Sequence, residues 1–440
     1  MNFHIKTLFV FLFFTVTGIS QGKFQIMDQK ESVSIPFTLV NNLVVIHMEV
    51  NGGDLAFLFD TGIDKTILFN LKVDQTKKMK DVEEIRLNGL GDGEPLKAMV
   101  SKNNLFSMDG LVNPNQMVYI IYDNMFDLSG KMGIDIHGII GGDLYRDFVV
   151  KVNYSSKKII FYEPELYSYK KCKNCETFPL DFYSQKPFID VLVQNHLGEE
   201  FKVKLLIDSG GGDAIWLFEN THPKIKVSNK YFNDYLGKGL NGDIYGKRSK
   251  IDKLKIGSFV FEDAFVSYPD SSNIDMALKN KERNGTLGAN ILRRFHVIYD
   301  YPGRKITLKK NSHFKKPFYY NKSGIELTYG GDMMVKERKS RYAEGTSQDG
   351  KPITQLIPSY VLAYKPSYQI SHLRDDSPAK NVGLLVGDII LEINGSLAYN
   401  KEMQEIIHIL SQKENKKIKL LISRNGQHFK YEFFLKSMFD

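Results

Sequence analysis

The sequence predicts a mainly β protein made of two similar β-rich lobes and a separate C-terminal domain. Three observations support this prediction: an internal repeat within the first three hundred residues, alternating apolar and polar segments bounded by turn residues in both copies, and a change of character after about residue 310. The chain has 440 residues, of which 42% are hydrophobic and 25% charged. These proportions are typical of packed domains, so a coiled coil, a collagen or a disordered chain is not expected.

Two landmarks define the repeat, because they recur at nearly the same spacing. Residues 58–62 read LFDTG, and residues 206–210, 148 positions later, read LIDSG. Residues 138–148 are echoed by residues 285–295, 147 positions later. Chance does not easily produce two such matches. The expected organisation is a signal peptide at 1–20, a first lobe at 28–165, a second lobe at 176–310 and a C-terminal domain at 320–440.

Each copy is expected to contain a β-hairpin close to its aspartate. Residues 43–50 and 55–59 flank the turn dipeptide Asn51-Gly52, a strong hairpin signal. Residues 189–193 and 202–207 repeat the pattern in the second copy. Each copy should close with a short helical piece and a pair of strands, at 148–154 with 158–162 and at 295–299 with 305–308.

The first twenty residues have the layout of a secretory signal peptide. Lys6 precedes the mostly apolar residues 7–16, and the small residues Gly18 and Ser20 stand at positions −3 and −1 of a cut after residue 20. The apolar run is shorter than the ~20 residues that cross a bilayer. We expect an exported protein, periplasmic or extracellular, with no transmembrane segment once the signal is removed.

Charge and cysteine content exclude other classes of function. The net charge is +8, but the lysines are scattered, whereas nucleic-acid binding calls for a concentrated basic stripe. Cys172 and Cys175 are the only cysteines, and a zinc site needs about four ligands. Residues 237–242 match G-x-G-x-x-G without the required strand and helix around it. We therefore expect no nucleic-acid partner, no metal and no other cofactor, and either a local disulfide between Cys172 and Cys175 or two free thiols.

The two Asp-[Thr/Ser]-Gly triplets supply the candidate catalytic residues. Asp60 and Asp208 each follow an apolar strand at the same point of the repeat. In lobes related by a pseudo-twofold axis the two carboxylates would face each other. Like charges about 3 Å apart cannot both ionise, so the pair would share one proton. One carboxylate could then activate a water while the protonated one binds the carbonyl of the bond to be cut.

The residues after each aspartate suit a supporting role. Thr61 and Ser209 are small hydroxyl residues that could bond across the lobe interface, and Gly62 and Gly210 allow a tight turn. The second loop carries one more residue than the first and extra glycine. The geometry around Asp208 is therefore less firmly predicted than that around Asp60.

These residues resemble the pepsin-like and retropepsin-like aspartic peptidases. Residues 60–68 are similar to the retroviral active-site segment, and residues 138–144 and 285–291 are similar to the apolar stretch under each catalytic loop. The resemblance covers about residues 30–310. It implies a bilobal acid-protease-like β fold, hydrolysis of peptide bonds, an extended polypeptide substrate in the cleft between the lobes, and no metal.

The same resemblance implies flaps over the cleft. The glycine-rich residues 89–93 stand at the flap position of the first copy and residues 239–243 at that of the second, which predicts two flaps, as in retropepsin dimers. The flap residues are expected to be Gly89, Leu90, Gly91, Gly239 and Leu240. The cleft walls are expected to be apolar, with Ile63, Ile67, Ile215 and Trp216.

The C-terminal region contains its own set of elements. Ser377 is a good N-cap before Pro378, residues 402–410 have helical spacing of apolar residues, and residues 418–423 and 428–435 predict a terminal hairpin. Residues 336–351 are polar enough to predict a loop.

This region resembles a PDZ domain, a partly open β-barrel with two helices, over about residues 320–440. Residues 324–329 would be its first strand, followed by a long insertion. The family implies recognition of an extended peptide, which adds as a strand. The peptide groove is expected at Ser367, Tyr368, Gln369 and Ile370. Its role would be substrate or partner docking, or else structural support of the second lobe.

Together these observations predict an exported aspartic endopeptidase that acts through Asp60 and Asp208. The alternatives are a catalytically inactive protein of the same fold that binds peptides, and a factor that cuts only itself.

Overall fold

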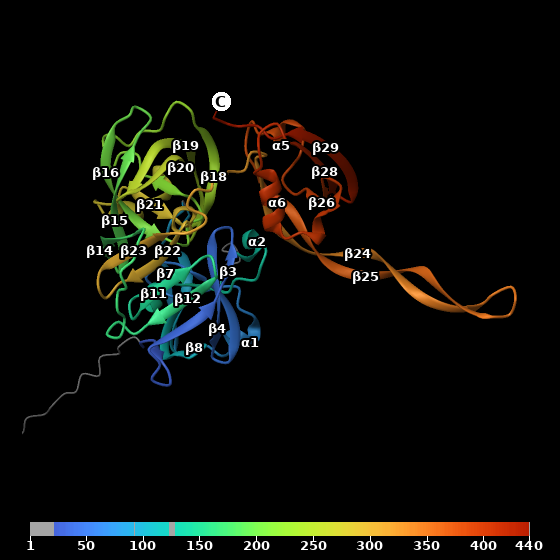
Figure 1. Ribbon diagram of the computed structural model, residues 1–440, viewed down its shortest axis with the longest axis horizontal. Coiled ribbons are helices and arrows are strands. Elements are labelled where there is room, and N and C mark those ends of the chain that lie inside the picture. Colours follow the sequence, from blue (N-terminus) through green and yellow to red (C-terminus); the bar gives the residue numbers. More distant parts are fainter. Residues whose placement is uncertain (1–21, 92, 123–127, 440) are drawn as a thin grey trace, which may run out of the picture.

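The computed structural model describes residues 22–91, 93–122 and 128–439, so the predicted signal peptide lies outside the described residues. The described chain is mainly β, as predicted (Figure 1). Two lobes lie one above the other in this view, the C-terminal domain lies beside them, and a long hairpin, β24–β25, projects away from the body.

The first lobe is formed around one twisted sheet. Its strand order is β1-β9-β6-β10-β5-β4-β8-β7, with β3 attached to β4. The predicted hairpin is confirmed as β4 and β5, whose register pairs Val50 with Gly53. The strands are β1 (Gln25–Ile26), β3 (Thr38–Val40), β4 (Leu43–Val50), β5 (Gly53–Phe59), β6 (Ile67–Leu68), β7 (Val82–Leu87), β8 (Leu96–Met108), β9 (Leu111–Ile121) and β10 (Gly138–Ile140).

The second lobe repeats this plan. Its sheet has the order β14-β15-β16-β21-β17-β20-β19-β18, and the predicted hairpin is confirmed as β15 and β16. The strands are β14 (Asp181–Tyr183), β15 (Lys186–Gln194), β16 (Glu200–Asp208), β17 (Ile215–Leu217), β18 (Phe232–Gly239), β19 (Gly242–Ile256), β20 (Phe259–Pro269) and β21 (Gly285–Gly288).

The pairing around each aspartate is the same in the two lobes. In the first, β10 runs parallel to β5 and antiparallel to β6, which is parallel to β9. In the second, β21 runs parallel to β16 and antiparallel to β17, which is parallel to β20. The repeat found in the sequence is therefore a repeat of topology.

A third sheet joins the lobes and contains their symmetry axis. Its order is β13-β23-β22-β11-β12-β2, so three strands of the second lobe continue into three strands of the first in one sheet. Lys151 of β11 pairs with Ile298 of β22, a separation of 147 residues, which is the spacing of the repeat. Equivalent residues therefore meet at this point. The strands are β2 (Ser32–Pro36), β11 (Val149–Asn153), β12 (Lys158–Tyr162), β13 (Cys175–Pro179), β22 (Phe295–Asp300) and β23 (Lys305–Lys310).

The helices are short and lie at the ends of strands. Helix α3 follows β10 and helix α4 follows β21, at equivalent points of the repeat. They are α1 (Val73–Thr76), α2 (Ser129–Met132), α3 (Gly142–Tyr145), α4 (Ala289–Leu292), α5 (Pro378–Asn381) and α6 (Met403–Leu410), with 3₁₀ turns η1 (Ser271–Asn273), η2 (Ala277–Lys279) and η3 (Ala398–Asn400). No helix in the described part of the chain is long and apolar enough to span a bilayer.

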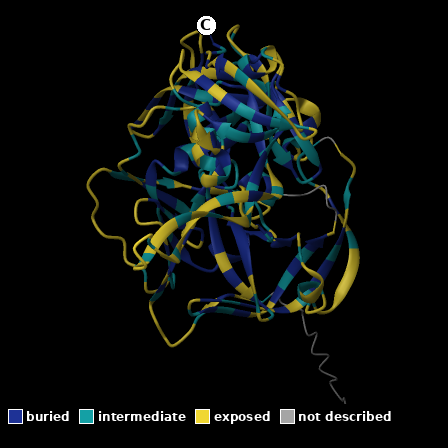
Figure 2. Ribbon diagram, turned by 90° about the vertical axis from the view of Figure 1, so that its right-hand side faces the viewer, coloured by how far each residue is buried: buried dark blue, intermediate teal, exposed yellow. Residues whose placement is uncertain are grey.

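One apolar core runs through both lobes and the joining sheet, whereas the C-terminal domain has a core of its own. Buried and exposed positions alternate along many strands of the lobes (Figure 2). The shared core explains why the lobes meet as one body: the strands that close each copy, β11 and β22, are buried between them. Burial of this apolar surface is the main term that holds the lobes together.

The C-terminal domain contains one sheet with the order β24-β25-β26-β28-β29 and β27 beside β26. The N-cap prediction is confirmed, because Ser377 Oγ accepts from Lys380 N at 3.3 Å. The loop predicted at residues 336–351 is wrong: most of it is strand, because β24 and β25 pair far beyond the domain. The strands are β24 (Ile325–Thr346), β25 (Pro352–Leu373), β26 (Ile389–Ile393), β27 (Ser396–Leu397), β28 (Lys417–Arg424) and β29 (Gln427–Phe434).

Candidate active site

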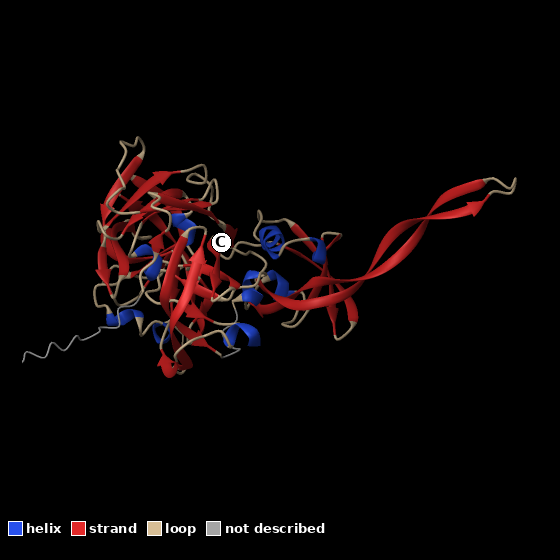
Figure 3. Cartoon of the chain, turned by 90° about the horizontal axis from the view of Figure 1, so that it is seen from below, coloured by secondary structure: helices blue, strands red, loops and turns tan. Residues whose placement is uncertain are grey.

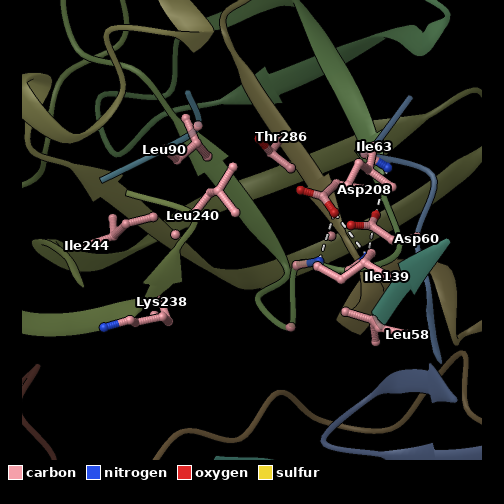
Figure 4. Close-up of a pocket in the computed structure, with 18 of the residues that line it drawn as sticks. Leu58, Asp60, Ile63, Leu90, Ile139, Asp208, Lys238, Leu240, Ile244 and Thr286 are labelled. Atoms are coloured by element: carbon pink, nitrogen blue, oxygen red, sulfur yellow. Dashed lines mark hydrogen bonds between the residues drawn. The ribbon is translucent and has the colours of Figure 1, made fainter. Parts of the chain in front are cut away.

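Asp60 and Asp208 meet at the seam between the lobes (Figure 4). Gly210 N donates to Asp60 Oδ1 at 3.1 Å and to Asp208 Oδ1 at 3.0 Å. One backbone N–H therefore bridges the two carboxyl groups. Gly62 N also donates to Asp60 Oδ1, at 2.7 Å, and Gly211 N donates to Asp208 Oδ1, at 2.8 Å. These bonds fix the positions of both carboxyl groups.

Thr61 and Ser209 lock the two aspartate loops together. Thr61 N donates to Ser209 Oγ at 3.0 Å, and Ser209 N donates to Thr61 Oγ1 at 2.9 Å. Each hydroxyl then donates to the other lobe, Thr61 Oγ1 to Ile207 O at 2.8 Å and Ser209 Oγ to Phe59 O at 3.0 Å. Both side chains are buried. All four bonds cross the lobe interface, so the two aspartates cannot separate without breaking them.

Glycines are required where the loops pass close to the carboxyl groups. A Cβ on Gly210 would lie 2.3 Å from Asp60 Cγ, and one on Gly62 would lie 2.9 Å from Asp208 Cγ. Under the first loop, Asp60 N donates to Ile140 O at 2.9 Å, and a Cβ on Gly141 would lie 1.7 Å from Asp60 O. The repeated segment therefore supports the aspartate loop from below, in the place that the sequence predicted for it.

The electrostatic environment of Asp60 and Asp208 favours a proton bound to this pair. Burial, the negative charge of Asp208 and the hydrogen bond between the two carboxyl groups raise the pKa of Asp60 to about 8, against the lowering effect of the bond from Gly62 N. Two close carboxyl groups titrate as a pair. The pair therefore holds a proton at neutral pH, which gives it one acid and one base.

Aromatic side chains form the floor beneath the aspartates. Tyr145 stacks on Phe59 with ring centres 4.5 Å apart and on Tyr301 with ring centres 5.2 Å apart. Tyr299 completes the group, 5.1 Å from Tyr145. All four rings are buried, so the site lies on an apolar base, which accounts for the strong effect of burial on Asp60.

The second loop is held by a partly buried ionic chain that the sequence did not reveal. Asp213 accepts from Arg248 Nη1 at 2.8 Å, from Trp216 Nε1 at 2.7 Å and from Ser267 Oγ at 2.8 Å. Arg248 Nε also donates to Asp234 Oδ2, at 2.7 Å. The carboxylate of Asp213 thus anchors this loop to strands β19 and β20.

The same chain reaches the C-terminal domain. Arg374 Nη1 lies 3.6 Å from Asp234 Oδ1, and the exposed fractions of the two side chains are 3% and 8%. Glu326 of β24 belongs to this group, because burial, followed by the charge of Asp234, raises its pKa to about 7. The aspartate loop, the strand β18 and the C-terminal domain therefore share one charged contact.

The two aspartates open into a cavity of about 910 Å³ between the lobes. The predicted wall residues Ile63, Ile67, Ile215 and Trp216 all line it. The C-terminal domain also contributes to the lining, through Glu326, Leu327, Ser371 and Ile407. The cleft thus runs from the lobes onto the C-terminal domain, a feature that the sequence did not indicate.

The predicted flaps close over this cavity and contact each other. The first is the hairpin β7–β8 and the second the hairpin β18–β19. Asn241 links them: its Oδ1 accepts from Gly89 N at 2.7 Å, its N donates to Leu90 O at 2.8 Å, and its O accepts from Gly93 N at 2.7 Å. Leu90 and Leu240 lie beside each other on the cavity side (Figure 4). Asn241 was not singled out in the sequence, where it appeared only as a turn residue.

The predicted peptide groove of the C-terminal domain requires correction. Tyr368 pairs with Tyr329 of β24 on one side and Ile390 of β26 on the other, and Gln369 is likewise paired twice. Because both edges are taken, no peptide strand can add at residues 367–370. The edge strands of this sheet are β24 and β29, and α6 and α2 lie close to β24.

The two cysteines form a disulfide, Cys172 to Cys175, in agreement with the first of the two predicted states. The pair lies at the start of β13, away from the aspartates. Its place in the chain is the connection between the lobes.

Comparison with known proteins gives two findings. Residues 369–424 match the family model of the PDZ domain, so the C-terminal domain is a PDZ domain. Among solved structures, the chain matches the crystal structure of an aspartic proteinase from Irpex lacteus with 12% identity and a TM-score of 0.39, over 65% of this chain and 99% of the other. No curated protein matches the chain.

Proposed function

We propose that this protein is an exported aspartic endopeptidase. The observation that carries the proposal is the Gly210 N–H shared between Asp60 and Asp208, since one N–H reaches both carboxyl groups only when they lie close together. The pair also lies on the symmetric seam and above an apolar floor. Such a pair has the one acid and the one base that hydrolysis of a peptide bond by water requires.

The geometry supports a direct mechanism. With the shared proton on Asp60, this carboxyl donates a hydrogen bond to the carbonyl oxygen of the bond to be cut. Asp208, ionised, accepts a proton from the attacking water, and the water oxygen forms the new bond to the carbonyl carbon. The proton held by Asp208 then passes to the departing amine nitrogen as the C–N bond breaks, and the pair returns to its one-proton state. The apolar walls favour apolar side chains on either side of that bond.

The PDZ domain would dock the same substrate. The lining of the cavity includes Leu327 and Ile407 of this domain, so a long peptide leaving the aspartates would reach it. Long peptides are expected to be cut with a lower KM than short ones, and Ile407→Glu should remove this advantage without changing the cleavage of short peptides.

The test is incubation of the chain without residues 1–20 with an unfolded polypeptide from acid to neutral pH, with fragments identified by mass spectrometry. Cleavage that is blocked by a pepstatin-type inhibitor and lost in Asp60→Asn supports the proposal. Asp54→Asn is a matched control, because Asp54 lies on the same strand, β5, with an exposed side chain. Binding of the polypeptide without turnover would instead identify a catalytically inactive peptide-binding protein, and cleavage of the chain alone a self-processing factor.

A further inference from the structure

The projecting hairpin is the largest feature of the molecule that the cleft does not explain. Beyond the PDZ sheet, β24 and β25 remain paired in regular register from Asp332 with Pro366 to Thr346 with Pro352. We call residues 332–366 the arm. At about 3.4 Å per residue the paired part is about 50 Å long, and it projects away from the body with a twist about its own axis (Figure 3). A two-stranded ribbon of this kind is marginally stable in water unless something packs on it.

The two faces of the arm differ. Cross-strand partners lie on the same face, and successive pairs alternate between faces, so the register assigns each side chain. One face, here called the aromatic face, contains large exposed side chains along its length. They are Met334 (60% exposed), Tyr342 (78%), Leu356 (60%), Tyr360 (58%), Leu362 (69%) and Tyr364 (74%).

The opposite face is more covered. It contains Val335, which is buried, Ile353 and Ile357, which are half-buried, and Val361, which is 36% exposed. The apolar side chains of the aromatic face are therefore the more exposed ones, between 58% and 78%, and all three tyrosines of the arm lie among them. A continuous exposed apolar surface of this kind is typical of an interaction site.

Charges on the aromatic face indicate what could cover it. The midpoint of this face is the pair formed by Ser340 and Pro358. Lys336 and Arg338 lie on one side of this midpoint, and Glu344 lies on the other. Lys336 Nζ lies 4.2 Å from the centre of the Tyr360 ring. A cation–π contact therefore exists on this face within one chain.

We propose that the aromatic face binds the aromatic face of a second copy of this chain, with the two arms antiparallel about a twofold axis through the Ser340–Pro358 pair. In this arrangement Lys336 faces the partner's Glu344. Arg338 faces the partner's Tyr342, and Tyr360 faces the partner's Leu356. These three contacts are an ion pair, a cation–π contact and an apolar contact, while at the axis Ser340 faces Ser340 of the partner subunit and beside it Leu362 faces the partner's Thr354. The interface is self-complementary, as a twofold requires.

The other packings fit less well. In a parallel arrangement Lys336 would face the partner's Leu362, and Glu344 the partner's Thr354, so neither charge would face an opposite charge. Edge-to-edge pairing would leave the aromatic face in water, and along β25 it is also opposed by Pro352, Pro358 and Pro366, which remove N–H donors. A stable interface has about 20–30 residues on each side, whereas the seven pairs from Met334 with Tyr364 to Thr346 with Pro352 supply fourteen. They would bury on the order of 1,000 Å², the lower limit for a specific contact, so a reversible dimer is expected.

Sedimentation of the chain without residues 1–20, over a range of concentrations, tests the proposal. We expect a monomer–dimer equilibrium that Leu356→Lys abolishes. Gln355→Lys is the matched control, because Gln355 is exposed on the opposite face, and it should leave the equilibrium unchanged. A chain that stays monomeric at every concentration, or the same loss in both variants, would overturn the proposal.

A charge exchange distinguishes the antiparallel arrangement. Lys336→Glu and Glu344→Lys should each weaken the dimer about tenfold or more, a change of about 1.4 kcal/mol, and the double variant should restore it. Failure of the double variant to restore the dimer would reject the antiparallel packing. A monomer that instead sediments with vesicles of anionic lipid would assign the aromatic face to a lipid surface, again rejecting the dimer.

Discussion

The proton held between Asp60 and Asp208 determines how the residues of the site respond to pH. The pKa of Asp60 is raised from 3.8 to about 8 by burial and by Asp208. In the folded state the pair has an acid only while this proton remains. We therefore expect hydrolysis to continue at neutral pH and to be lost as the pH rises through about 8. The measurement is kcat/KM as a function of pH.

The same shift predicts a change in stability. Between about pH 4 and 8 the folded state binds more protons at Asp60 than the unfolded state does, so the free energy of unfolding falls as the pH rises. Asp60→Asn removes this contribution. The variant should therefore gain stability relative to the unmodified chain between pH 4 and 8, measured by denaturant unfolding. Asp54→Asn should give a curve parallel to that of the unmodified chain, and a parallel curve for Asp60→Asn would contradict the assignment.

Glycine at position 210 is expected to be essential for activity. A Cβ there would lie 2.3 Å from Asp60 Cγ and Oδ2, so Gly210→Ala must displace the carboxyl group. A displacement of about 1 Å can lower kcat about 100-fold, and we expect at least this loss in kcat/KM. Gly212→Ala is the matched control: its Cβ would have Asn41 O, at 3.5 Å, as its nearest contact. Equal losses in the two variants would contradict the argument.

At the scale of elements, the contact between the flaps determines access to the cleft. Asn241→Ala removes the acceptor for Gly89 N, a hydrogen bond of about 1 kcal/mol, while the backbone bonds of residue 241 remain. We expect amide hydrogen exchange at Gly89 to become about fivefold faster, with a change in KM larger than the change in kcat. The exposed Asn233 lies on the same hairpin, so Asn233→Ala should leave exchange at Gly89 unchanged.

At the scale of the whole molecule, the ionic chain connects the PDZ domain to the second aspartate loop. Arg374→Met would leave Asp234 bonded to Arg248 alone, which should loosen the domain contact by about 2 kcal/mol. The expected results are faster limited proteolysis of the 311–324 connection and a weaker dependence of KM on substrate length. Lys380→Met removes an exposed ion pair with Asp375, which contributes little, and so serves as the control.

Most local features could be predicted from the sequence because they depend on short stretches of chain. The hairpins β4–β5 and β15–β16, the cap at Ser377 and the helix α6 follow from turn chemistry and apolar spacing. The repeat was visible because two lobes of the same topology need the same residues at the same strand ends. That pattern was also sufficient to select Asp60 and Asp208 as a pair.

Only the tertiary structure decided the contacts between segments that are far apart in the chain. Arg248, Asp213 and Arg374 read as ordinary charged residues until folding buries them together, and Asn241 reads as a turn residue until the second flap meets it. The polar stretch at 336–351 reads as a loop, because strand pairing, unlike apolar alternation, is set by the partner strand. The sequence by itself determined which two carboxyl groups meet at the seam. The three-dimensional fold decided what holds them, covers them and extends their cleft, since pairing partners and burial are properties of distant segments brought together.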